Sequence, residues 1–146
     1  MVPIKKLDEK LSVAPQIAEE DFAALAKEGF RTVINNRPEN EGPDQIPDPQ
    51  ARQLADAAGL AYLQIPVTSQ SLGPEAIARF GQALNEEQGP ILAHCRSGTR
   101  STLLWALSQA EAGTFSVEEI MERAAKAGYD LSAMRPMIEA HASGRG

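Results

Sequence analysis

The amino-acid sequence predicts an α/β fold of three layers, in which a mostly parallel sheet of about four strands is flanked by helices. Two observations predict it. Short aliphatic or β-branched runs alternate with longer amphipathic segments, and glycine or proline separates most of them. Strands that alternate with helices are typical of a parallel sheet covered by those helices. The chain of 146 residues has single-domain length, so residues 1–146 are expected to form one domain.

The first half of the chain supplies two helices and two strands. Apolar residues at helical spacing predict a helix over 18–28, and the β-branched run after it predicts a buried strand over 32–35. Several prolines and a glycine make 37–47 a loop. An aspartate followed by a proline begins a helix over 48–59. The aliphatic run over 60–67 is the next predicted strand.

The second half continues the alternation. A proline opens a helix over 74–88, and the aliphatic run 91–94 predicts a third strand. A leucine-rich face predicts a helix over 100–112. A Ser-Val-Glu-Glu capping box begins a helix over 116–128, and a last helix is expected between 131 and 142, interrupted at its proline.

Composition excludes several classes of function. The net charge of −6 argues against a nucleic-acid or anionic membrane surface as partner. The single cysteine excludes an intramolecular disulfide, and the two distant histidines give no metal-site spacing, so neither a metal nor another cofactor is expected. The N-terminus lacks the apolar region of a signal peptide, and no apolar run approaches the length of a membrane span. The sequence therefore predicts a cytoplasmic protein.

The segment that carries chemistry is His-Cys-Arg-Ser-Gly-Thr-Arg-Ser, residues 94–101. Cys95 follows the predicted strand 91–94 and precedes a helix. A thiolate is the nucleophilic form of cysteine, and a helix N-terminus favours negative charge. We therefore interpret Cys95 as a covalent nucleophile. A small buried hydrophobic residue is the alternative, which the glycine and two arginines that follow make less favourable.

The residues after Cys95 are typical of an anion-binding loop. Gly98 permits a tight turn, so that successive N–H groups can point inward at a tetrahedral anion. Arg100 can add a bidentate guanidinium, and Ser101 can donate its hydroxyl to the sulfur. The residues expected to bind the anion are Arg96, Ser97, Gly98, Thr99 and Arg100.

The sequence allows two roles for each of three further residues. Arg96 can face solvent or the substrate. His94 can tune Cys95 or orient the backbone at the strand end. Arg37 follows a strand end at the same edge of the sheet, where it can bind an anionic substrate or pack its loop at the surface. His94 and Arg37 are therefore supporting candidates.

The loop resembles the phosphate-binding loop of cysteine-dependent protein tyrosine and dual-specificity phosphatases. The chain is more closely similar to a family of small bacterial proteins labelled as phosphatases or sulfur transferases, which also forms the phosphatase-like domain of beta-lactamase-hydrolase-like protein. The resemblance implies the phosphatase fold and hydrolysis of phosphomonoesters through a thiophosphoryl intermediate on Cys95. The segments that carry it are 11–13 with Gln16, 32–38, 94–101, 103–107 and 127–131.

Two departures from the phosphatase pattern favour another chemistry. The phosphatase arginine lies six residues after the cysteine, where this chain has Ser101, and Arg100 comes one residue early. That spacing resembles the rhodanese loop, whose cysteine carries a persulfide. The general acid of dual-specificity phosphatases would fall near Ser69, yet 68–73 contains no acid. Glu75, and Glu39, Glu41 and Asp44 in the other loop at this edge, can replace it, and Glu75 and Asp44 are the candidates kept.

Each candidate acid also has a simpler interpretation. Glu75 lies in the first turn of a predicted helix, where it favours the helix dipole. Asp44 shares its loop with Glu39 and Glu41, and loop acids are usually solvated.

The sequence thus leaves three hypotheses. The leading one is a cysteine-dependent phosphatase-like hydrolase. The second is a rhodanese-type sulfurtransferase that uses a Cys95 persulfide. The third is a non-catalytic module that binds anions or phosphopeptides. The expected partner is a small anionic substrate or a phosphorylated protein or peptide.

Overall fold

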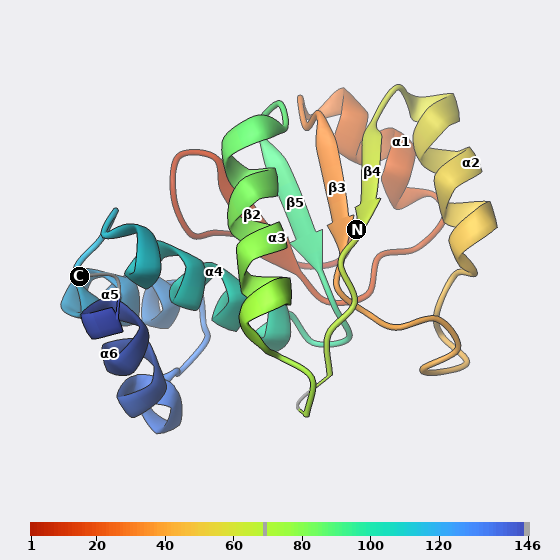
Figure 1. The fold of residues 1–146 in the computed structure, drawn as a ribbon. Helices are drawn as coiled ribbons and strands as arrows, with labels where there is room; N and C mark the ends of the chain where they lie inside the picture. The colour runs from red at the N-terminus through yellow and green to blue at the C-terminus, as the bar shows by residue number, and fades with distance from the viewer. Residues whose placement is uncertain (69, 145–146) are drawn as a thin grey trace.

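A computed structural model describes residues 1–68 and 70–144 and shows a five-stranded sheet between two layers of helices (Figure 1). The strand order is β1-β2-β5-β3-β4. All neighbouring strands are parallel except β1 and β2. The predicted fold class is therefore confirmed. The strands are β1 (Lys5–Lys6), β2 (Leu11–Ala14), β3 (Thr32–Asn35), β4 (Ala61–Gln64) and β5 (Ile91–His94).

The helices follow the predicted alternation. The capping box forms as expected, with the Ser116 hydroxyl accepting from the Glu119 N–H and the Glu119 carboxylate accepting from the Ser116 N–H. None of the described helices is long and apolar enough to cross a membrane. The helices are α1 (Asp21–Lys27), α2 (Asp48–Ala58), α3 (Pro74–Glu86), α4 (Thr99–Ala112), α5 (Val117–Lys126), the 3-10 helix η1 (Ser132–Met134) and α6 (Arg135–Gly144).

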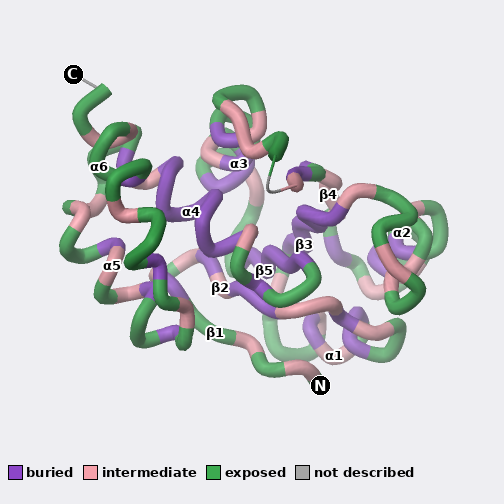
Figure 2. The backbone as a smooth tube through the Cα atoms, turned by 90° about the horizontal axis from the view of Figure 1, so that it is seen from below, coloured by how far each residue is buried: buried purple, intermediate pink, exposed green. Residues whose placement is uncertain are grey.

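Both faces of the sheet are buried. Figure 2 shows α1 and α2 on one side of the strands and α3 and α4 on the other. Because side chains alternate along a strand, Val33 and Leu92 pack with the first pair, whereas Ile34 and Ala93 pack in the larger cluster with α3 and α4. Burial on both faces explains why the central strands are continuous apolar runs.

The structure corrects the predicted strands in two places. The chain has β1 and β2 in addition to the three strands located from the sequence. Their short segments lack a strong strand pattern, and a turn in which Asp8 Oδ1 accepts from the N–H groups of Lys10 and Leu11 joins them. The strand expected over 60–67 is shorter, because β4 ends at Gln64, before Pro66, which has no N–H to continue the ladder.

The register places the functional segment at one edge of the sheet. His94 on β5 pairs with Ala14 on β2 and with Asn35 on β3, so three strands end at the same level. The N–H of Asn36 donates to the carbonyl of His94 at 2.8 Å, directly beside Cys95. The residues after these strands therefore meet at the carboxyl edge, where parallel sheets bind ligands.

Candidate active site

Cys95 begins the loop from β5 to α4, and its side chain is buried. Gly98 has a φ of 96°, a left-handed conformation that favours glycine. This turn directs the Gly98 N–H at the Cys95 sulfur, with 3.0 Å between the nitrogen and Sγ. An N–H aimed at sulfur stabilises the thiolate, the negatively charged form of the cysteine. Residues 95–101, which we call the cradle, thus form a loop whose N–H geometry around Cys95 can bind an anion.

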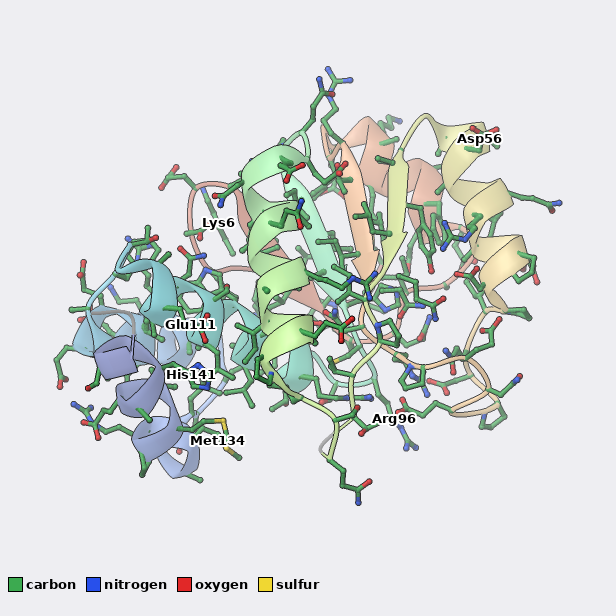
Figure 3. All side chains as sticks on the ribbon, in the orientation of Figure 1. Lys6, Asp56, Arg96, Glu111, Met134 and His141 are labelled. Atoms are coloured by element: carbon green, nitrogen blue, oxygen red, sulfur yellow. The ribbon has the colours of Figure 1, made fainter. Side chains whose placement is uncertain are left out.

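The N-terminus of α4 adds to this cradle. Gly98 is its N-cap residue and has no side chain to cap the first turn. Backbone N–H groups at such a helix end lack intrahelical partners and can bind an anion. Ser97 and Thr99 are exposed at the loop surface, and their hydroxyls lie 3.1 Å apart. Arg96 is exposed beyond the carboxyl ends of the strands, whereas Glu111 and His141 lie together on the side formed by α4 and α6 (Figure 3).

Arg100 is held by the loop between β3 and α2. Its Nη1 and Nη2 each donate to a different oxygen of Glu41 at 2.8 Å, and Nη1 also donates to the Val67 carbonyl at 2.8 Å. These bonds use three of the guanidinium's five N–H groups. The remaining two form the Nε–Nη2 edge, which can bind two oxygens of one anion.

The guanidinium of Arg100 also lies beside Cys95. The hydrogen bond with Glu41 raises the pKa of Arg100, and the charge of Cys95 contributes in the same direction. Arg100 therefore joins the loop cysteine to a carboxylate 59 residues earlier.

Sequence reasoning weighed Glu41 only as a replacement acid or a solvated loop residue and missed its pairing with two arginines, because loop acids are usually solvated. Its side chain is 24% exposed and pairs with both Arg37 and Arg100. The hydrogen bond from Arg100, with a second from Arg37, lowers the pKa of Glu41 to about 2. The carboxylate is therefore ionised at neutral pH and cannot serve there as a proton donor. The four-residue spacing from Arg37 was the available sequence signal.

Arg37 is completely buried, so the alternative that placed it at the surface is wrong. Its Nε donates to Glu41 at 2.9 Å, and its Nη1 donates to Gln16 Oε1 at 2.9 Å and to Asp44 Oδ2 at 3.1 Å. Gln16 in turn donates its backbone N–H to the Arg96 carbonyl at 3.2 Å. Arg37 thus anchors the β3–α2 loop to the cradle, and three of its N–H groups already have partners in the protein.

Ser101 has a different partner from the one expected. Its buried hydroxyl donates to Asn36 Oδ1 at 2.7 Å, and a hydroxyl has one proton to donate. The Asn36 amide donates to the Ile65 carbonyl at 2.9 Å. Ser101 therefore ties α4 to β3 in this structure, and its proton is not directed at the Cys95 sulfur.

His94 is buried at the end of β5, and burial lowers its pKa to about 4. The imidazole is therefore neutral at neutral pH. This favours the orienting role for His94, because a neutral ring adds no positive charge next to the sulfur.

The two candidate acids belong to different segments: Asp44 lies in the loop between β3 and α2, and Glu75 lies at the start of α3. The Arg37 hydrogen bond lowers the pKa of Asp44, so this carboxyl is ionised at neutral pH as Glu41 is. Glu75 is exposed at the first turn of α3, in a hollow that it lines with Ser71 and Arg79. Ser69, near which the phosphatase acid would fall, lies outside the described residues. Among the residues that are described, no group of His, Cys, Asp and Glu could hold a metal ion.

Removing Arg37 is expected to destabilise the fold strongly. Arg37→Ala should lower the free energy of unfolding by about 3 kcal/mol, because it leaves Glu41 and Asp44 without their shared cation and opens space in the loop. Urea or thermal unfolding measures the change. Arg52→Ala is the matched control, since Arg52 forms a half-exposed pair with Asp48 and should cost less than about 1 kcal/mol. Equal losses in the two variants would contradict a structural role for the buried network.

Comparison with solved structures defines the class. A candidate phosphatase from Neisseria meningitidis is 35% identical, with a TM-score of 0.85 over 94% of this chain and 97% of that one. The core catalytic domain of a PP-IP phosphatase from S. cerevisiae, in complex with citrate, is 14% identical, with a TM-score of 0.72 over 95% of this chain and 86% of that one. The second likeness shows the fold alone. The chain has the fold of the protein tyrosine and dual-specificity phosphatases.

Sequence comparison identifies the family within this fold class. Residues 3–112 match the phosphatase-like domain of beta-lactamase hydrolase-like protein, and the chain belongs to this family, as the sequence predicted. The beta-lactamase hydrolase-like protein of Agrobacterium fabrum is 35% identical over 134 residues, which are 92% of this chain and 31% of that protein. The chain therefore spans about a third of the length of the curated relatives it matches.

Proposed function

We propose that residues 1–146 act as one phosphatase-like domain that hydrolyses phosphomonoesters with Cys95 as the nucleophile. One observation carries the proposal: the Gly98 N–H is directed at the Cys95 sulfur, and the guanidinium of Arg100 lies beside the same residue. This arrangement can stabilise a thiolate and the oxygens of a phosphoryl group bound to it. Membership of a phosphatase-like family supports the same chemistry.

The reaction has two steps. The Cys95 thiolate attacks phosphorus, an S–P bond forms, and the P–O bond to the leaving group breaks with its electron pair on oxygen. The loop N–H groups and the Nε–Nη2 edge of Arg100 hold the oxygens of the transferring group. Water then attacks phosphorus, the S–P bond breaks, and inorganic phosphate leaves as the thiolate is restored.

The charged state of the nearby acids indicates which substrates react fastest. Glu41 and Asp44 are ionised at neutral pH, so neither can protonate a leaving oxygen there. Substrates whose leaving group needs no proton should therefore be preferred, and aryl phosphates that release an acidic phenol are of this kind. Glu75 is a candidate acid for other esters.

The loop spacing supports sulfur transfer as a second candidate. Arg100 lies five residues after Cys95, as in the rhodanese loop that this segment resembles. In that reaction the outer sulfur of thiosulfate bonds to Cys95 and sulfite leaves. Cyanide then takes the sulfur as thiocyanate, which restores the thiolate.

A two-donor assay tests the proposal. The purified chain is supplied with an aryl phosphate or with thiosulfate and cyanide, and phosphate and thiocyanate are measured. We expect phosphate release that vanadate inhibits, and a phosphoryl group on the Cys95 peptide after an acid quench. Thiocyanate without phosphate, with one added sulfur on Cys95, would replace the proposal with the second candidate. Phosphate binding without turnover of either donor would indicate a non-catalytic anion-binding module.

A further inference from the structure

Tyr129 covers the Gly98 side of the loop, although it lies outside the segment that carries the chemistry. It follows α5, and its ring is partly buried against the larger hydrophobic cluster. Its hydroxyl donates to the Ser97 carbonyl with 3.2 Å between the oxygens. A Cβ atom added to Gly98 would lie 2.0 Å from the same hydroxyl. The C-terminal part of the chain therefore contacts the cradle directly through this residue.

The two hydrogen bonds at this point belong to one peptide group. The Ser97 carbonyl and the Gly98 N–H are the two polar ends of a single planar unit, and in a trans peptide they point in opposite directions. Tyr129 binds the carbonyl end at 3.2 Å, and the Cys95 sulfur accepts from the N–H end at 3.0 Å. The position of one bond therefore sets the direction of the other.

We infer that Tyr129 is a positioning residue that keeps the Ser97–Gly98 peptide turned with its N–H toward the Cys95 sulfur. The inference deepens the proposed function, because it assigns the support of the nucleophile to a residue outside the loop. Rotation of this peptide would bring its carbonyl oxygen toward a sulfur or phosphoryl group that carries negative charge. Glycine tolerates such rotation better than any other residue, so Gly98 leaves the loop in need of an external support.

The chemistry of Tyr129 suits this role. Burial, together with the charge of Cys95, raises the pKa of Tyr129, so its hydroxyl keeps its proton as a donor at neutral pH. A hydrogen bond to a carbonyl polarises the peptide and strengthens its N–H as a donor at the other end. Tyr129 therefore acts through the peptide, without contact with the reacting phosphoryl group.

The test compares Tyr129→Phe with the wild-type chain, since phenylalanine keeps the ring and removes only the hydroxyl. The rate at which iodoacetamide alkylates Cys95 is measured against pH. We expect the midpoint of this profile to move up by roughly half a pH unit, because the sulfur loses an aligned N–H. With an aryl phosphate, kcat should fall about tenfold while KM changes little, because the lost alignment stabilises the transition state most.

Tyr62→Phe is the matched control, because Tyr62 is the chain's other tyrosine and lies on β4, packed against the hydrophobic cluster on the opposite face of the sheet. Its alkylation profile should equal that of the wild type. An unshifted profile for Tyr129→Phe, or equal shifts in both variants, would overturn the inference. The alkylation measurement needs no turnover, so a failure of the phosphatase proposal is distinguished from a failure of this inference.

A crystal structure of Tyr129→Phe gives an independent measurement. We expect the Ser97–Gly98 peptide to populate a second orientation, with its carbonyl toward Cys95. A single unchanged orientation would overturn the inference even if the variant proved less stable than the wild type.

Discussion

Cys95→Ser is expected to lower kcat for an aryl phosphate by at least about 10⁴-fold, since removal of a covalent nucleophile abolishes the intermediate. Serine is similar in size, and its hydroxyl can accept the Gly98 N–H that the sulfur accepts in the structure. A serine hydroxyl, however, ionises far less readily than a thiol, and His94, whose pKa burial lowers to about 4, is too weak a base to activate it.

The same variant should keep the anion cradle. Inorganic phosphate should bind with an affinity within a few-fold of the wild type, because the N–H groups and Arg100 are unchanged. Phosphate binding by calorimetry and thermal unfolding provide the controls for folding. Turnover that survives the substitution would show that another residue attacks phosphorus, and the assignment of Cys95 would then be wrong.

Arg100→Lys should lower kcat/KM for the same substrate by about 10²- to 10³-fold, although the positive charge is kept. An ammonium group cannot bind both oxygens of Glu41, reach the Val67 carbonyl and still present a two-donor edge to a phosphoryl group. Most of the loss should appear in kcat, because the guanidinium geometry is matched to the charge that develops in the transition state.

Arg123→Lys is the matched control for this substitution. Arg123 donates to the Leu7 carbonyl at 3.0 Å and lies over the Phe115 ring, away from the cradle. Its replacement should leave kcat/KM unchanged within about twofold, since it has no contact with the loop. A similar loss of activity in both variants would indicate that arginine removal acts through folding.

The elements that were predicted correctly are those with strong local signals. The strand over 32–35 and the capping box at Ser116 depend on neighbouring residues, and both formed as expected. The loop around Cys95 could also be located from the sequence, because Cys95 and Gly98 belong to one contiguous segment. Strand β1 could not be predicted, because it pairs only two residues at the edge of the sheet.

The parts of the site that were missed depend on long-range packing. Ser101 bonds to Asn36 because the register of β3 against β5 brings them together, and spacing along the chain does not show this. Arg100 and Glu41 meet across 59 positions, and Tyr129 reaches Ser97 across 32. Side-chain partners at such separations are fixed by the assembled layers.

The shared carboxylate of Glu41 also limits how this fold can diversify. Connecting loops are ordinarily where a protein family gains or loses residues without loss of function. Here the four-residue interval from Arg37 to Glu41 links a buried cation to the arginine of the cradle. A residue inserted in that interval would shift Glu41 against both guanidinium groups at once. We therefore expect the two arginine contacts of Glu41 to constrain the length of this interval more tightly than that of an ordinary surface loop.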